Sequence, residues 1–135
     1  MKLLFKRPPL RSVPMQIVLI RPGATVYSEQ GRIAGNLELP LSEAGQAEVR
    51  ALIPQVQPLK LTAIYSNEAG VEDETAELLS ESLGIKHKTL PELANLDHGL
   101  WQGMLIDEIC EKQSKVSKQW QENAGAICPP EGEML

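Results

Sequence analysis

The feature that most constrains the fold of this chain is the apolar run at residues 17–20 (IVLI), which stops at Arg21, Pro22 and Gly23. A short run rich in β-branched residues and closed by a Pro-Gly pair is typical of a buried strand that ends in a loop. In an α/β sheet, ligands bind at the loops that leave the carboxyl ends of the strands. Arg21 would stand at the tip of this strand, so the loop predicts a site for an anion.

The composition indicates one globular domain. A chain of 135 residues allows a single core, and 42% hydrophobic and 23% charged residues are ordinary for it. No apolar run approaches the ~20 residues of a membrane-spanning helix, and the start lacks a signal-peptide core. We therefore expect a cytoplasmic protein without a membrane partner. Cys110 and Cys128 fit a reducing compartment and match no metal-ligand spacing, so we expect no metal and no cofactor.

The charge is unevenly distributed. Residues 1–14 contain four basic residues and no acidic one, whereas the rest contains nine basic and eighteen acidic residues. The basic residues and three prolines predict a flexible leader over residues 1–14, followed by a domain at residues 15–135. A nucleic-acid or lipid-binding arm is the alternative, with weak support because it lacks a run of aromatic residues. The acidic body argues against nucleic acid as the main partner.

Cap and turn signals predict the elements in order. Residues 26–41 are predicted to be a loop because glycine, asparagine and proline punctuate them. Ser42 precedes an amphipathic run and predicts the N-cap of a helix that Pro54 ends or kinks. Strands are predicted at residues 61–66 and, as an edge strand, 85–90; helices are predicted at residues 72–83, 106–112 and 115–122. The alternation of strands and helices predicts an α/β fold with parallel strands.

A series of short motifs carries a resemblance to a known family. In chain order they are Arg21-x-Gly23-x-Thr25, Gln30-Gly31-Arg32, Leu39-Pro40-Leu41-Ser42-x-x-Gly45, Ile64-Tyr65-Ser66, Thr75-Ala76-Glu77, Leu96-Asp97-x-Gly99-x-Trp101-x-Gly103 and Pro129-Pro130-x-Gly132-Glu133. In their order and spacing, residues 16–135 resemble the phosphoglycerate-mutase-like branch of the histidine phosphatase superfamily. The resemblance implies a three-layer α/β/α fold with a mostly parallel sheet, incomplete at its C-terminal end.

The resemblance also implies a chemistry. In that family an Arg-His-Gly turn after the first strand supplies a histidine nucleophile that attacks phosphorus, while arginines hold the phosphoryl oxygens. A carboxylic acid protonates the leaving group, and a second histidine late in the chain completes the pocket. Each of these groups can be sought at its matching position in this sequence.

No catalytic position is intact in this chain. Arg21 and Gly23 match the turn, but Pro22 stands where the nucleophile should be, and its amide nitrogen has no lone pair available. Val71 stands at the position of a second phosphate-clamping arginine, and Asn95 at the position of the general acid. The late histidine has no counterpart, because the sequence ends before that motif.

Five residues are left as phosphate-binding candidates: Arg21, Gly23, Thr25, Ser28 and Arg32. For Arg32, a solvated loop position is an equally good interpretation. Acidic residues at positions 68 and 72–74 should face the ligand and repel a dianion. His87 is predicted to be an exposed strand residue and His98 a packing residue.

The fold implied by the resemblance has further strands after residue 135, one of them between residues 17–20 and 61–66. Without it, strand edges and apolar faces would be exposed, with Trp101 and Trp120 available to a partner. Three cases follow from a missing strand. Either another chain supplies the strand, or the sheet closes differently, or the domain is marginally stable. The first case predicts an oligomer through the exposed sheet edge. The favoured interpretation is that the sequence is a fragment, because residues 132–135 look like the start of a helix.

Two classes of function follow. The first is a non-catalytic protein of this family that binds a phosphorylated small molecule or a protein partner. The second is an active phosphomonoester hydrolase or mutase that uses residues outside this segment. A truncated product without a function is a third interpretation.

Overall fold

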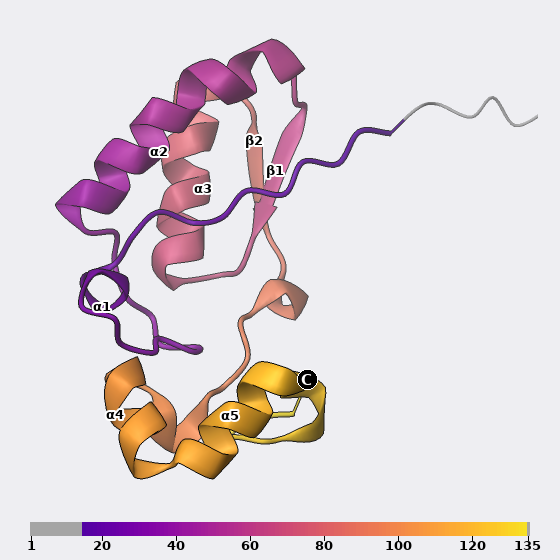
Figure 1. The fold of residues 1–135 in the computed structure, drawn as a ribbon. Coiled ribbons are helices and arrows are strands. Elements are labelled where there is room, and N and C mark those ends of the chain that lie inside the picture. Colours follow the sequence, from indigo (N-terminus) through magenta and orange to yellow (C-terminus); the bar gives the residue numbers. More distant parts are fainter. Residues whose placement is uncertain (1–14, 135) are drawn as a thin grey trace, which may run out of the picture.

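Helix α3 (Gly70–Leu83) packs against two parallel strands, β1 (Ala63–Ser66) and β2 (Lys86–Thr89), and α2 (Glu43–Val56) packs against α3. This arrangement is seen in Figure 1, drawn from a computed structural model that describes residues 15–134. The predicted leader at residues 1–14 lies outside the described residues. The α/β class and the parallel sheet are confirmed.

The sheet has one face packed and one face open. The register pairs Ile64 with His87 and Tyr65 with Lys88. Ile64 packs against the core beside α3, so by alternation Tyr65 and Lys88 lie on the opposite face. Tyr65 is 51% exposed there, and the described residues place no covering layer on that face.

The core is small and lies between α2, α3 and the loop before α2. Leu41, Val49 and Leu79 are its buried centre, and Ile20 and Ile64 pack against them. Leu79 on α3 is fully buried, as the periodicity of that helix predicts. This core therefore joins the start of the chain to the sheet.

The prediction of a buried strand at residues 17–20 is wrong for the described structure. Those residues are extended, but they pair with no strand among residues 15–134, and Ile17 and Leu19 are 72% and 93% exposed. A strand needs a hydrogen-bonded neighbour, and none lies beside this run. In Figure 1 the run crosses in front of the strands as an irregular segment.

A short helix replaces part of the predicted loop at residues 26–41. Helix α1 (Val26–Glu29) begins at Thr25, whose side chain forms a capping box with Ser28. The capping box supplies partners for backbone groups that a helix start leaves free, which favours one helical turn here. The loop predicted from the glycine and proline residues therefore begins only after α1.

The other helices begin and end close to the predicted residues. Ser42 caps α2 by accepting the N–H of Gly45, and α2 runs two residues past Pro54. Helix α3 begins at Gly70 and stops at Gly84, which has a φ of 67°. Helices α4 (Ile106–Lys112) and α5 (Ser114–Glu122) follow the predicted pair. Among residues 15–134, no helix is both long and apolar enough to cross a membrane.

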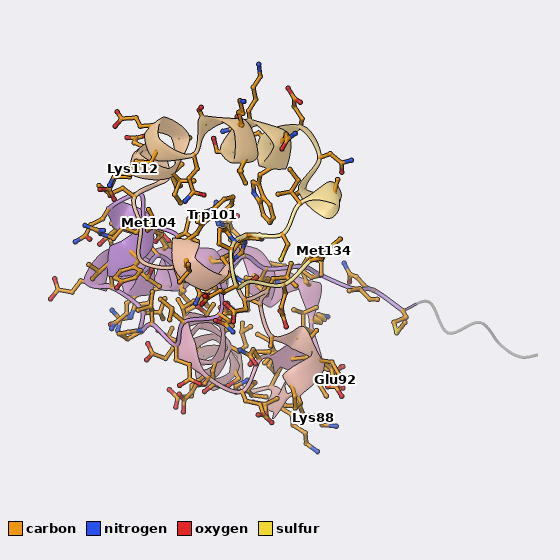
Figure 2. The ribbon with its side chains drawn as sticks, turned by 90° about the horizontal axis from the view of Figure 1, so that it is seen from below. Lys88, Glu92, Trp101, Met104, Lys112 and Met134 are labelled. Carbon is orange, nitrogen blue, oxygen red and sulfur yellow. The ribbon has the colours of Figure 1, made fainter. Side chains whose placement is uncertain are left out.

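Helices α4 and α5 pack around two tryptophans. Trp101 is 1% exposed, and its ring meets that of Trp120 edge to face at 5.7 Å. Its Nε1–H donates to Gln113 Oε1 at 3.0 Å. In Figure 2, Trp101 lies beneath α5, whereas Lys88 points away on the opposite side of the molecule. Trp101 is therefore a core residue, and its predicted availability to a partner is wrong.

The C-terminal segment is a loop docked on residues 97–100. The N–H of Leu100 donates to Pro130 O at 2.9 Å, and the N–H of Glu133 donates to Asp97 O at 2.8 Å. Because the N–H of Glu133 bonds across to Asp97, residues 132–134 form no helical turn. The predicted start of a helix at this point is wrong for the described residues.

Candidate functional site

The loop after residues 17–20 is held between α2 and α3. The N–H of Gly23 donates to Oγ1 of Thr75 on α3 at 3.1 Å. A Cβ on Gly23 would lie 2.6 Å from Leu41 Cδ2 and 2.7 Å from the carbonyl oxygen of Gly45. Glycine is therefore needed here because the chain passes so close to α2, and Gly23 fixes the loop through packing.

The next residue, Ala24, is also fixed through its backbone. Its N–H donates to Glu48 Oε2 at 3.0 Å, and its C=O accepts the N–H of Ser42 at 2.9 Å. Consecutive backbone N–H groups in a loop are the donors that usually hold an anion. Here the N–H groups of Gly23 and Ala24 are already bonded to a hydroxyl and a carboxylate.

The two hydroxyl candidates serve the cap of α1. Thr25 Oγ1 accepts the N–H of Ser28 at 3.1 Å, and Ser28 Oγ accepts the N–H of Thr25 at 2.8 Å. The Ser28 hydroxyl also lies 2.9 Å from Thr25 O as a donor. Thr25 is buried, so in this arrangement its hydroxyl shapes the loop.

Arg21 is the candidate whose charge is available. Its side chain is exposed and forms no hydrogen bond or ion pair with any other residue in the described part of the chain. Pro22, half-buried, separates it from the fixed Gly23. An anion reaching this loop would therefore meet one free guanidinium beside a rigid turn.

Arg32 joins two loops. Its Nη1 donates to Gly103 O at 2.7 Å, its Nε donates to Gln30 Oε1 at 3.0 Å, and its backbone forms a bridge with Leu105. The side chain is half-buried. These contacts contradict the interpretation of Arg32 as a solvated loop residue, whereas phosphate binding by Arg32 stays a prediction.

Val71 and Asn95, which stand where the family has a phosphate-clamping arginine and a general acid, also have structural contacts. Val71 packs against the core formed by Leu41, Val49 and Leu79. Asn95 Nδ2 donates to Gly35 O at 3.0 Å. Together with Pro22, these positions contribute an apolar contact, an amide and a proline ring, which supply neither a carboxylic acid nor a cation.

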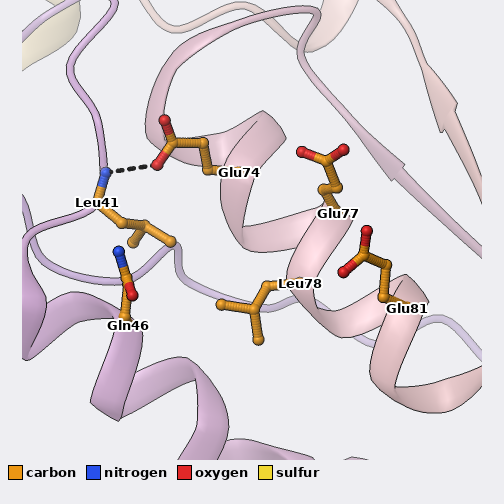
Figure 3. Close-up of a pocket in the computed structure, with 6 residues that line it drawn as sticks. All are labelled: Leu41, Gln46, Glu74, Glu77, Leu78 and Glu81. Carbon is orange, nitrogen blue, oxygen red and sulfur yellow. Dashed lines mark hydrogen bonds between the residues drawn. The ribbon is translucent and has the colours of Figure 1, made fainter.

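The acidic start of α3 is directed toward α2. Glu74 Oε2 accepts the N–H of Leu41 at 2.8 Å. Beyond this bond a groove of about 380 Å³ runs between the helices, lined by Leu41, Gln46, Glu74, Glu77, Leu78 and Glu81. Figure 3 shows the three carboxylates along one side of α3. Three like charges make this groove unsuitable for a phosphate.

His87 has a contact that the sequence interpretation missed. Its Nε2 lies 2.7 Å from Ser66 Oγ and 3.6 Å from Asp73 Oδ1. Since the Ser66 hydroxyl donates to Asn67 O at 2.8 Å, the Nε2–H of His87 donates to Ser66. The prediction of an exposed residue is wrong, because β1 and α3 partly cover the ring. The parallel pairing of Ile64 with His87 is the signal that places Ser66 on the same face.

His98 packs as predicted. Its ring meets that of Trp120 at 5.6 Å, and its Nδ1 is buried with no hydrogen-bond partner among the described residues. Within residues 15–134, no three His, Cys, Asp or Glu side chains lie close enough to hold a metal ion.

A family model described as the histidine phosphatase superfamily, branch 1, matches residues 17–135. The chain belongs to the histidine phosphatase superfamily. The match begins in the extended run and includes every candidate site position described above. The resemblance carried by the short motifs is therefore confirmed.

Relatives in this superfamily include enzymes and are longer. The chain is 27% identical over 121 residues to "Probable phosphoglycerate mutase GpmB" of Yersinia pestis, covering 90% of this chain and 56% of that protein. A mycobacterial glucosyl-3-phosphoglycerate phosphatase complexed with VO3 superposes with a TM-score of 0.77 at 26% identity, over 84% of this chain and 56% of that one. YhfR of Bacillus stearothermophilus superposes with a TM-score of 0.74 at 26% identity and the same coverage. The chain thus spans just over half the length of these histidine phosphatase relatives.

Proposed function

We propose that this histidine phosphatase family member transfers no phosphoryl group and acts by binding an anionic ligand at Arg21. The ligand class is a phosphorylated small molecule or a phosphorylated group on a protein partner. The observation that carries the proposal is the pair Arg21 and Pro22: an exposed guanidinium stands directly before a residue with no nucleophilic atom. The loop thus retains a charge for the anion and lacks the atom that would accept phosphorus.

The geometry of the loop around Arg21 also limits its affinity for an anion. Arg21 offers at best one bidentate contact, and the neighbouring N–H groups of Gly23 and Ala24 are bonded to Thr75 and Glu48. An exposed pair between two charges contributes only about 0–1 kcal/mol. We therefore propose weak binding of a bare phosphate, with most of the affinity coming from the rest of the ligand.

A second candidate is an active phosphomonoesterase that takes its reactive groups from outside residues 15–134. Its support is that the chain spans 56% of the length of a relative named as a phosphatase. Against it stands Pro22, which lies within the matched segment whatever else is present. The two candidates differ in whether phosphate is released.

Hydrolysis and binding can be measured on the same protein. We expect p-nitrophenyl phosphate to be hydrolysed no faster than in a protein-free blank, with and without Mg²⁺. We expect phenyl phosphate to shift the amide resonances of Arg21 and residues 23–25 in a saturable way. Arg21→Ala should remove this shift, whereas Arg50→Ala, which deletes the same charge from the exposed side of α2, should preserve it.

Each outcome bears on a separate part of the proposal. Steady phosphate release that Arg21→Ala abolishes would overturn the non-catalytic part. Absence of binding, or equal binding by the wild-type and Arg21→Ala proteins, would overturn the assignment of Arg21.

A further inference from the structure

The groove of about 380 Å³ between α2 and α3 combines apolar side chains with negative charge. Leu41 and Leu78 line it with apolar groups, and the carboxylates of Glu74, Glu77 and Glu81 follow one another along α3 (Figure 3). No basic side chain lies among its lining residues. Such a groove is complementary to a segment that carries cations beside apolar side chains.

Two of these carboxylates are placed unfavourably for the helix that carries them. Glu77 and Glu81 are exposed, lie four residues apart and form no ion pair with any described residue. Like charges at this spacing destabilise a helix. Glu81 also lies in the last turn of α3, where the helix dipole favours a cation, and that turn contains no basic residue. A cationic segment in the groove would offset both effects, so the helix itself indicates a ligand of positive charge.

The first fourteen residues of the chain have the complementary composition. They contain four basic residues and no acidic one, and the apolar run Leu3-Leu4-Phe5 directly precedes Lys6 and Arg7. Residues 15–135 contain eighteen acidic and nine basic residues, so they attract this segment. The same acidic body would repel nucleic acid and anionic lipid, which are the other anionic partners that a basic segment could bind.

Residues 1–14 are long enough to reach the groove. Ile20 packs against the core that Leu41 helps to form, and Leu41 also lines the groove. The extended residues 15–20 lead away from that core over at most about 20 Å, whereas fourteen further residues can span up to about 46 Å. A tethered segment also has a high effective concentration, so weak contacts are enough to hold it.

We propose that residues 1–14 dock in the groove between α2 and α3 of their own chain. Lys6 and Arg7 lie beside the carboxylates of α3, and the apolar run before them covers Leu78. Exposed ion pairs are individually weak and are screened by salt, so the contact is reversible and depends on ionic strength.

A spin label on the full chain tests this contact. With Cys110 and Cys128 replaced by serine, Leu10→Cys can carry a nitroxide. At low salt the nitroxide should broaden the amide resonances of Gln46 and Leu78 several-fold more than those of α5, which lies at the other end of the molecule (Figure 1). About 1 M salt shortens the Debye length to about 3 Å and should reduce this broadening several-fold.

Charge reversal tests the assignment of the residues. Glu77→Lys together with Glu81→Lys should remove the broadening. Adding Lys6→Glu and Arg7→Glu to that protein should restore it, because the opposite charges then face each other again. Since both glutamates are exposed, the melting temperature of each variant should show that the protein stays folded.

The matched control makes the same change of charge elsewhere. Glu111 and Glu122 are exposed on α4 and α5, so Glu111→Lys with Glu122→Lys should preserve the broadening. Arg21→Ala should preserve it too, which separates this contact from the proposed anion site.

Three results would overturn the proposal. The first is the absence of broadening at low salt, and the second is broadening that persists after charge reversal in the groove. The third is broadening in a mixture of ¹⁵N-labelled chain without nitroxide and unlabelled chain with it, which would assign the groove to residues 1–14 of a second copy.

Discussion

The backbone N–H of Gly23 donates a 3.1 Å hydrogen bond to the Oγ1 of Thr75, which joins the loop beside Arg21 to the second turn of α3. Thr75 is 4% exposed, so this bond is shielded from water. Helix α3 also packs against both strands. The position of the candidate site is therefore set by a helix whose other contacts belong to the core.

The first prediction tests that bond. Thr75→Val keeps the shape of the side chain and removes the acceptor, which leaves the N–H of Gly23 unpaired. We expect the free energy of unfolding in urea to fall by about 1–3 kcal/mol, and the amides of Arg21 and residues 23–25 to exchange faster. Thr62→Val, at an exposed position before β1, is the control and should change neither. Equal stability of the two variants would contradict the importance of the bond.

The second prediction concerns the close approach at Gly23. Gly23→Ala would place a methyl group against Leu41 and the backbone of Gly45, and the backbone cannot move without displacing α2. We expect a loss of about 1–3 kcal/mol in urea unfolding. Gly125→Ala is the matched control, because a Cβ there would lie 3.6 Å from the nearest atom, Asn123 Oδ1. A Gly23→Ala protein as stable as this control would show that the loop is not clamped.

The third prediction concerns the missing nucleophile. Pro22→His alone should give no turnover of p-nitrophenyl phosphate, because Val71 and Asn95 still supply neither a second cation nor an acid. The measurement is phosphate release together with a search for phosphohistidine by mass spectrometry under alkaline conditions. Phosphohistidine formed during turnover of the single variant would show that these positional assignments are wrong.

The fourth prediction concerns the packing of α4 and α5. Trp101→Ala removes a side chain that is 1% exposed, together with its edge-to-face contact with Trp120 and its bond to Gln113. We expect a loss of about 3–5 kcal/mol. Leu100→Ala, one residue away and 58% exposed, should cost less than about 0.5 kcal/mol. Comparable losses would mean that Trp101 is not a core residue.

Elements set by local signals could be predicted from the sequence. The cap at Ser42 and the stop at Gly84 act through bonds within a few residues, and both helices lie where these signals place them. The β-branched run and the Pro-Gly pair that closes it predict a strand at residues 17–20 from local sequence alone. Pairing is a long-range property, and the described chain brings no neighbour to that run. The capping box of Thr25 and Ser28 has a serine where the usual sequence signature has Glu or Gln, so the sequence does not reveal this helical turn.

Some features of the candidate site could likewise be predicted from the sequence, and others could not. The identity of Pro22 is a chemical fact of the sequence and needs no structure. The sequence could not show that Arg32 bonds to Gly103 or that Asn95 bonds to Gly35, because those partners are 71 and 60 residues away. The contact of His87 with Ser66 depends on strand register, which the sequence does not specify.

The bond between Glu48 and the N–H of Ala24 has a consequence for any ligand of this loop. The carboxylate is an internal competitor, because it already fills one of the places where an incoming oxyanion would bind. Entry of a ligand is then an exchange of one negative group for another, and its strength depends on how easily Glu48 swings away. The affinity of the loop for an anion would thus depend on Glu48, a residue of α2 that belongs to none of the short motifs.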